Sequence, residues 1–424
     1  MIPDMPPPSQ PTHRLNWADL GLVVCLVAAS LGLGFGLSSS NDGSHVALAR
    51  ALSQGRVELQ QDRDLTLRVD VAVREGVSYS DRPPGTAALA TPALWIGQRF
   101  DASWAQTTQK SGVLVVWPAR KKYAGTYAAR LRDGPALITL QASALAASSH
   151  ARLMSAVGLL LMLWLLARKG IAATPRRVTV AALAFCSLWG PYSVMLFNHV
   201  SAATLLLATW CIALDSQSNR RIWLVLGGVV GAMCVATDYL LVLAVVPMVA
   251  LHCKPTRWWW WLLGAAPVAL AVAWYHQLAF GNPWATGYSF QSNFAFARSL
   301  GSTFDRSPLH GFWILFGSGR DAGLLAQAPL WLLGLLGLWR QPRIALPWFA
   351  WLLAICTHHT PWGGGTMDHR YIVPLLPLAA LGLARVLSSS VNGRRRIALG
   401  AVTAALALYS SSRVWSHLFE WRGL

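Results

Sequence analysis

The chain has 424 residues, of which 54% are hydrophobic and only 12% are charged, and its mean hydropathy is +0.42. Soluble proteins carry about 25% charged residues, so this composition excludes a soluble globular or disordered protein. The formal net charge is +18. Such a basic balance can indicate a nucleic-acid partner, and the placement of the lysines and arginines decides whether it does.

The apolar residues fall into runs long enough to cross a bilayer, whose hydrocarbon core is about 30 Å thick. The first run, residues 18–37, follows a proline-rich tail over residues 1–16 that has no cleavable signal pattern. Ten further runs bring the predicted number of transmembrane helices to about eleven, and they centre on residues 153–167, 178–197, 200–214, 222–236, 238–252, 258–279, 321–339, 344–357, 371–387 and 397–412. Because lipid offers no hydrogen bonds to the backbone, the chain is predicted to be an all-α polytopic membrane protein.

Lysine and arginine in the short loops predict the orientation of these helices. One set of alternating loops is rich in them, with Arg168, Lys169, Arg176, Arg177, Arg220, Arg221, Lys254, Arg257, Arg340, Arg343, Arg385, Arg394, Arg395 and Arg396. The short loops between them hold only Arg370. The rich set is expected in the cytoplasm, which places residues 1–16 inside and the tail 413–424 outside. The positive charge is then largely topological and requires no nucleic acid.

Two long outer segments, residues 40–152 and 280–320, interrupt the transmembrane domain predicted over residues 17–412. Of the 17 acidic residues, nine lie in the first of these segments, and nine of the 11 histidines lie on or near the outer side. Such a one-sided set of ionisable groups predicts a functional site on the outer face.

The first outer segment begins with SSSNDGSHVALARAL, in which Asp42 comes directly after the first apolar run. Val46, Ala49 and Leu52 recur at helical spacing, so residues 44–54 are predicted to form an amphipathic helix that lies on the membrane. Taken alone, Asp42 is also explained as a helix N-cap, a position for which Asn41 competes.

The motif YSDRPPG follows at residues 79–85. The double proline ends one element and favours the start of a second interfacial helix, which places Asp81 and Arg82 at its N-terminus. A helix N-terminus beside an arginine suits a phosphate group. An exposed ion pair at a turn is the alternative interpretation.

Further polar motifs lie at the predicted outer ends of later helices. They are residues 190–199 with Tyr192 and His199, residues 280–290 with Tyr288, residues 316–321 with Arg320, and residues 358–371 with His369 and Arg370. Glycine, proline and asparagine favour turns in these motifs, and their aromatic rings can stack on a sugar. The set His358, His359, Asp368 and His369 can supply zinc ligands, although its spacing fits no standard zinc motif.

Taken in order over residues 20–390, these motifs resemble the GT-C class of integral-membrane glycosyltransferases. The similarity is greatest to glycosyltransferase family 39, the protein O-mannosyltransferases and the lipid A aminoarabinose transferases. It rests on Asp42 ahead of the letters ARAL, on YSDRPPG, on FGNPWATGYSF and on the late GGG…HRY…PLLP segment. The resemblance implies a GT-C fold with interfacial helices in a large first periplasmic loop. It also implies a bacterial inner-membrane location, with a cytoplasmic N-terminus and an active site that faces the periplasm.

The resemblance further implies an inverting enzyme that moves a sugar from a polyprenyl-phosphate carrier to a hydroxyl group of an acceptor. Asp42 corresponds to the general base, Asp81 to the acid before the double proline, and Arg82 to the basic residue near the carrier phosphate. His45 stands three positions after Asp42, where the aminoarabinose transferases have a basic residue. The family's second acid in this loop has no clear match.

These residue types suit glycosyl transfer. A carboxylate must accept the proton of the acceptor hydroxyl as the new bond forms, and the leaving phosphate needs nearby positive charge. The expected phosphate-binding residues are Arg82, Arg320, Arg370 and His369, and the expected substrate-binding residues are His45, Tyr79, Tyr192, His199 and Tyr288. No metal is required, because fixed cations can do the same work, and dependence on a divalent metal stays open. The expected partners are the lipid-linked sugar, membrane lipids, and an acceptor that is a protein such as a pilin, a lipopolysaccharide or another envelope glycan.

Two other classes of protein remain as alternatives. A transporter or flippase of lipid-linked glycans would show inverted repeats and acids at mid-membrane, and the sequence shows neither. An O-antigen ligase or polymerase also works on the outer face, but it would not be expected to carry both Asp42 and YSDRPPG.

Overall fold

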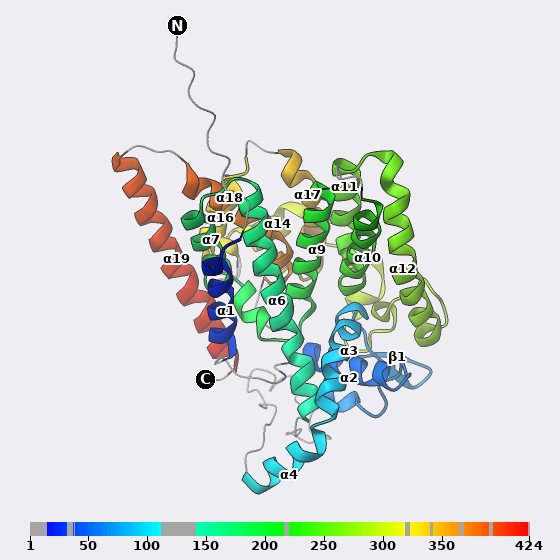
Figure 1. Cartoon of the computed structure of the whole chain (residues 1–424). Helices are drawn as coiled ribbons and strands as arrows, with labels where there is room; N and C mark the ends of the chain where they lie inside the picture. Colours follow the sequence, from blue (N-terminus) through cyan, green and yellow to red (C-terminus); the bar gives the residue numbers. More distant parts are fainter. Residues whose placement is uncertain are drawn as a thin grey trace.

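The computed structural model describes residues 15–31, 37, 39–111, 141–215, 220–318, 323–339, 342–363, 369–389 and 393–422. These described residues are mostly helical, with 76% of them in helices. Figure 1 shows long helices that run side by side as a bundle, with the shorter elements of the first outer segment gathered at one end.

Each of the eleven predicted apolar runs contains a helix, and these helices are α1 (Trp17–Leu31), α6 (Ala142–Arg168), α7 (Ala173–Phe185), α9 (Asn198–Leu214), α10 (Arg221–Thr237), α11 (Val242–His252), α12 (Trp258–Phe280), α16 (Leu330–Leu336), α17 (Pro342–Thr357), α18 (Leu376–Ser388) and α19 (Gly393–Arg422). Within the described ranges, four helical stretches are long and apolar enough to cross a membrane, namely Ala142–Arg168, Pro255–Phe280, Arg370–Ser388 and Gly393–Phe419. Five shorter apolar helices accompany them, over Trp17–Leu31, Asn198–Leu214, Arg221–Thr237, Tyr239–His252 and Ile344–Thr357. The chain is therefore a multi-pass membrane protein, and the number of eleven spans stays a prediction.

Two of the predicted runs are broken helices. In the run 178–197, α7 is followed by the short helix α8 (Trp189–Ser193), and in the run 321–339 the single turn α15 (Leu324–Gln327) comes before α16. Pro191 lies in the first turn of α8, after the first break, and Pro329 lies at the second break, directly before α16. Proline cannot donate the backbone hydrogen bond that a continuous helix needs. At the end of the chain α19 continues through residues 413–422, which the sequence analysis assigns to an outer tail.

The first outer segment contains α2 (Ser40–Ser53), η1 (Arg63–Thr66), β1 (Ala72–Arg74), β2 (Val77–Tyr79), α3 (Gly85–Gln98) and α4 (Asp101–Ser111). Strands β1 and β2 pair antiparallel, with Val73 opposite Ser78. Glu75 and Gly76 join them with φ angles of 53° and 79°, as a two-residue hairpin turn requires. The all-α prediction was therefore wrong in this detail, because a three-residue strand is too short to show an alternating pattern.

The helix that contains Asp42 is buried. It begins at Ser40, four residues earlier than predicted, and residues 41–49 are all buried. Helices α3 and α6 pack on α2, so it does not display one polar face as a surface helix would. The predicted amphipathic helix over residues 44–54 is therefore an internal helix, and its polar residues face protein.

The second outer segment packs against the first. It contains η5 (Gly287–Phe290), η6 (Ala295–Arg298), α13 (Leu300–Thr303) and α14 (Pro308–Phe316). An isolated bridge pairs Gln291 with Ala72 of β1. Arg306 donates from Nη2 to the backbone oxygen of His359 over 2.6 Å, which joins this segment to the end of α17.

Candidate active site

A buried cluster of two carboxylates and one guanidinium lies in the first outer segment and consists of Asp70, Asp81 and Arg82. Arg82 donates from Nη2 to Asp70 Oδ1, and its Nε lies 3.3 Å from Asp81 Oδ1. The exposed fractions of the side chains are 15% for Arg82, 7% for Asp70 and 2% for Asp81. Although burial opposes the charged form of Arg82, the charges of Asp70 and Asp81 raise its pKa. The guanidinium therefore stays charged beside two carboxylates.

The chain folds the cluster together through local turns and one distant residue. The backbone N–H of Arg82 donates to Ser80 Oγ over 3.1 Å, where β2 gives way to α3. From the second outer segment, Gln291 Nε2 donates to Asp81 Oδ2 over 3.1 Å and to the backbone oxygen of Val69 over 3.1 Å. Burial raises the pKa of Asp81 to about 6, and Arg82 opposes this shift. The Asp81 carboxyl group thus keeps its proton to a higher pH than an exposed aspartate does.

Asp42 lies in the first turn of α2, next to this cluster. Its Oδ1 accepts from the Ser39 backbone N–H over 2.7 Å and from Ser39 Oγ over 3.1 Å. This is a capping box in which Ser39 is the N-cap, so neither Asp42 nor Asn41 occupies the cap position itself. The neighbouring Ser40 Oγ donates to Asp70 Oδ2. Ser40, two residues before Asp42 in the chain, therefore links the start of α2 to the cluster.

Two buried histidines, His45 and His199, lie between α2 and α9. The exposed fractions are 0% for His45 and 2% for His199. Within the described part of the chain, none of their four ring nitrogens has a hydrogen-bond partner. Burial, together with the charge of Arg82, lowers the pKa of His45 to about 3, so this ring is neutral. Buried polar atoms without partners are costly, and the two rings therefore indicate a place where a polar ligand binds.

Arg370 adds a second guanidinium within electrostatic range of His199. Its exposed fraction is 7%, and its guanidinium carbon lies 5.6 Å from the ring centroids of Phe197 and Tyr371. The guanidinium groups of Arg370 and Arg82 both lie close enough to His199 for their positive charges to disfavour a charged His199 ring. Gly363 has a φ of +92°, and a Cβ there would lie 2.6 Å from Arg370 Cγ. Only glycine therefore lets this arginine take its position.

The three predicted tyrosines differ in their surroundings. Tyr288 of η5 lies within electrostatic range of Arg82, and the Tyr192 ring meets the His199 ring edge-on at 5.4 Å. Both belong to the site. The ring of Tyr79 packs edge-on against Phe280 at 5.7 Å, in an aromatic cluster at the end of α12.

His369 takes a structural position rather than a position beside Arg82. It has a φ of +71°, and its Nε2 lies 2.6 Å from the backbone oxygen of Ile314 in α14. A carbonyl only accepts, so Nε2 must carry the proton. Burial lowers the pKa of His369 to about 4, so the ring is neutral and its other nitrogen is an acceptor. The phosphate-binding role of His369 stays a prediction. Arg320 lies outside the described residues.

The histidines of the considered zinc set have other partners. His359 Nδ1 lies 2.9 Å from Asp305 Oδ2, and His358 Nδ1 accepts from the Thr360 backbone N–H over 3.0 Å. Asp368 lies outside the described residues. Over the ranges that the structure describes, no three or more His, Cys, Asp or Glu side chains are placed to hold a metal ion.

Asp70 and Gln291 were not predicted as site residues, and Tyr371 was predicted only as the last residue of the motif 358–371, without a role of its own. Asp70 is one of several acids in its loop, and its partner Arg82 lies 12 residues away, across the hairpin. Gln291 and Asp81 are 210 residues apart. The contact of the Tyr371 ring with His199 at 5.8 Å likewise joins two distant segments. Only the tertiary fold brings these residues together.

An apolar groove runs along α10, α11 and α12 and ends near the cluster. Its volume is about 590 Å³, and its walls are almost entirely apolar. The polar end is formed by Tyr239 and His276, with Pro283, Trp284 and Thr286 beside them. The Tyr239 ring lies edge-on to Tyr288, with centroids 6.4 Å apart. The groove thus opens beside a residue that lies close to Arg82.

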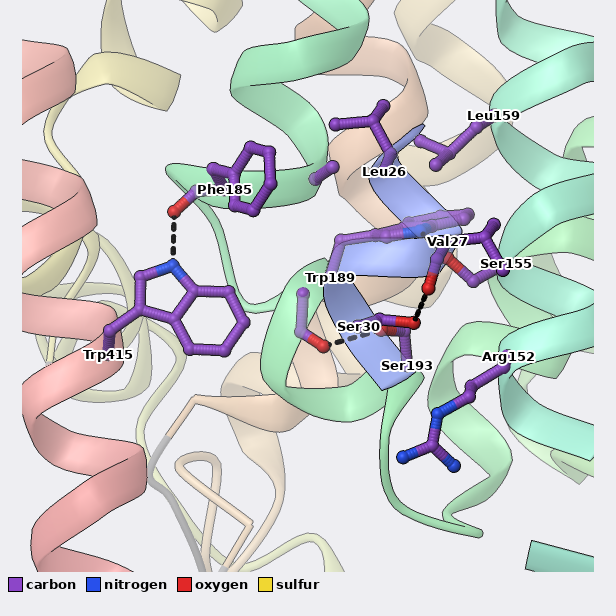
Figure 2. A pocket seen from close by; sticks show the side chains of 12 residues that line it. Leu26, Val27, Ser30, Arg152, Ser155, Leu159, Phe185, Trp189, Ser193 and Trp415 are labelled. Carbon is purple, nitrogen blue, oxygen red and sulfur yellow. Dashed lines mark hydrogen bonds between the residues drawn. The ribbon is translucent and has the colours of Figure 1, made fainter. Parts of the chain in front are cut away.

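A smaller pocket lies beside α6 and is also lined by residues of α1, α8 and α19. Figure 2 shows Arg152, Ser155 and Trp189 around it, with Trp415 of α19 donating to the backbone oxygen of Phe185. None of Asp70, Asp81 and Arg82 lines this pocket.

Comparisons with known proteins give one structural likeness. No family model matches the chain, and no curated protein matches it. Its fold is similar to a crystal structure of ArnT from Cupriavidus metallidurans in the apo state, with a TM-score of 0.51 and 16% sequence identity. The similarity covers 96% of this chain and 77% of that one. The chain has the fold of ArnT. ArnT is a GT-C glycosyltransferase, so the GT-C fold predicted from the sequence is confirmed.

Proposed function

We propose that the protein is a membrane glycosyltransferase that moves a sugar from a polyprenyl-phosphate carrier to a hydroxyl group of an acceptor on the periplasmic face of a bacterial inner membrane. The observation that carries this proposal is the set of the buried Asp42, Asp70 and Asp81 with the largely buried Arg82, together with an apolar groove whose polar end contacts Tyr288, on the fold of ArnT. A carboxylate, fixed cations and an apolar channel are the three parts that a lipid-linked glycosyl donor requires.

In the proposed reaction Asp42 is the general base. The acceptor O–H transfers its proton to the Asp42 carboxylate as the acceptor oxygen bonds to the anomeric carbon. The bond from that carbon to the phosphate oxygen breaks at the same time, and its electron pair leaves with the phosphate. Attack from the face opposite to the leaving group inverts the anomeric carbon. No metal ion takes part in this scheme, and a divalent ion would be an addition to it.

Arg82 and Arg370 are proposed to hold the phosphate of the donor. Growing negative charge on the leaving phosphate is stabilised by cations that are already in place. Asp70 and Asp81 fix Arg82 through the contacts described above, and the neutral rings of His45 and His199 donate to the sugar or phosphate oxygens. Tyr192 and Tyr288 complete the walls of the sugar site.

The groove along α10–α12 is proposed to hold the polyprenyl chain of the donor. Its walls are apolar, and its polar end lies beside Tyr288. Burying apolar surface stabilises binding by about 25 cal/mol per Å², so a long chain adds affinity that a short chain lacks. The acceptor is proposed to be a protein such as a pilin or an envelope glycan. A flippase and an O-antigen ligase are not favoured, because the fold is that of ArnT.

The deciding experiment replaces the carboxylate of Asp42 without removing the cap. In Asp42→Asn the amide oxygen still accepts from Ser39, so α2 keeps its N-terminal capping, while the basic group is lost. Sugar transfer in membranes is expected to fall by at least about a hundredfold. The matched control is Asp64→Asn, which changes an acid of the same loop whose side chain is 52% exposed. Full transfer by Asp42→Asn would refute the assignment of the base.

A further inference from the structure

Tyr239 and His276 form a directed pair of hydrogen bonds at the polar end of the groove. Tyr239 Oη lies 2.7 Å from His276 Nε2, and His276 Nδ1 lies 3.2 Å from the backbone oxygen of Pro283. The Pro283 oxygen only accepts, so in the neutral ring Nδ1 carries the proton and Nε2 accepts from the Tyr239 hydroxyl. The pair thus ties η3 (Tyr239–Leu241) and α12 to the loop that follows α12.

The same loop reaches the acidic cluster a few residues later. Gly287 passes so close to the chain at the cluster that a Cβ there would lie 2.6 Å from the Ser80 backbone oxygen and 2.7 Å from Asp81 Cα. Tyr288 follows, edge-on to Tyr239. The loop is therefore held at one end by the groove and at the other by Asp81, with little freedom between.

We infer that the Tyr239–His276 pair couples the occupancy of the groove by an isoprenoid chain to the placement of Tyr288 beside Arg82. This inference rests on the proposed function. A chain in the groove packs on both rings and excludes water from their hydrogen bonds, which strengthens those bonds. The loop then holds Tyr288 where the phosphate binds. Tyr239 and His276 are positioning residues in this account, because they act on the reacting groups only through the loop.

The coupling has a consequence that simple apolar binding lacks. Without it, a longer chain adds affinity through the groove alone and leaves the phosphate contacts unchanged. With it, binding of the remote chain strengthens the contacts at the phosphate. The loss of affinity caused by Arg82→Gln should then be larger for a long-chain phosphate than for a short one.

The test measures the dissociation constants of the purified full-length protein for undecaprenyl phosphate and geranyl phosphate, each with Arg82 intact and with Arg82→Gln. In the otherwise unchanged protein, Arg82→Gln is expected to weaken the long ligand about tenfold more than the short one. In Tyr239→Phe and in His276→Gln this difference should disappear. Tyr409→Phe is the matched control, because it removes a hydroxyl that bonds to the Ala326 backbone oxygen, away from the groove, and should keep the difference.

Each result decides between the two claims. If the tenfold difference persists in Tyr239→Phe and His276→Gln, the coupling is refuted while the donor site stands. If Arg82→Gln weakens both ligands equally in the otherwise unchanged protein, the coupling is refuted in the same way. If undecaprenyl phosphate does not bind, the proposed donor is wrong and the coupling falls with it.

Discussion

Replacing Arg82 by glutamine tests whether the buried cluster is built as described. The substitution leaves Asp70 and Asp81 buried with no guanidinium between them, at exposed fractions of 7% and 2%. Removing one partner of a buried ion pair costs about 3–5 kcal/mol. For a large domain this corresponds to a fall in melting temperature of roughly 5 °C or more.

The stability lost in Arg82→Gln is expected to depend on pH, and the pKa of Asp81 determines the direction of this dependence. Without Arg82, the folded-state pKa of Asp81 lies above its unfolded value, because burial already raises the pKa of Asp81 to about 6 with Arg82 present. The folded variant then binds more protons than its unfolded state, so its stability rises as the pH falls. The gap between Arg82→Gln and the unchanged protein should therefore narrow between pH 7.5 and pH 5.

The assay is thermal unfolding in detergent, followed through the fluorescence of the 22 tryptophans. Arg68→Gln is the matched control, because Arg68 forms an ion pair with Asp64 at side-chain exposures of 40% and 52%, and such surface pairs contribute about 0–1 kcal/mol. Adding Asp81→Asn to Arg82→Gln should restore part of the lost stability. A melting temperature for Arg82→Gln that equals the Arg68→Gln value at both pH values would refute the buried cluster.

Three further predictions concern ligand binding and the loop around it. Between pH 7.5 and pH 5.5, the affinity of the unchanged protein for undecaprenyl phosphate should rise relative to the affinity of the Asp81→Asn variant, because protonation of Asp81 leaves more of the Arg82 charge for the phosphate. The titration of the ligand itself affects both proteins equally. A ratio of the two dissociation constants that does not change with pH would argue against this role of Asp81. Gly287→Ala should destabilise the protein by about 1–3 kcal/mol in thermal unfolding, since the added Cβ would meet the Ser80–Asp81 backbone. Gly301→Ala is the control and should not destabilise the protein, because nothing lies within 4 Å of its added Cβ. Equal melting temperatures of the two variants would contradict the close approach at Gly287. Ala269→Trp in the groove should weaken the binding of undecaprenyl phosphate but not of geranyl phosphate in the same binding assay. Ala401→Trp on α19 is the control and should change the binding of neither ligand. If Ala269→Trp does not weaken the binding of undecaprenyl phosphate, the groove is not part of the donor site.

The sequence predicts the helical membrane fold well because hydropathy acts along each segment by itself. Each apolar run could be identified without knowing what it packs against, and all eleven runs contain helices. The breaks before α8 and before α16 show the limit of that rule, since each run as a whole stays apolar although its helix is interrupted. The burial of α2 depends on α3 and α6, which come later in the chain, so periodicity within α2 could not reveal it.

In the candidate site, too, contacts between neighbouring residues could be predicted from the sequence, and contacts between distant residues could not. Asp81 and Arg82 are adjacent in the chain, and their pairing could be expected from the motif that contains them. The contacts of Arg82 with Asp70, and of Asp81 with Gln291, form across the hairpin and between the two outer segments. When the partner of a residue is distant in the chain, the neighbouring residues do not indicate the contact. A single sequence shows only such neighbouring residues, so these contacts could not be predicted from it.

Sugar transfer itself is tested most directly by the intact masses of envelope proteins and glycolipids from cells that lack this chain, from cells that carry it, and from cells that carry Asp42→Asn at equal membrane levels. The account predicts a mass increment of one sugar on an acceptor only where the unchanged chain is present. The same increment with Asp42→Asn, or identical masses in all three cells, would contradict it.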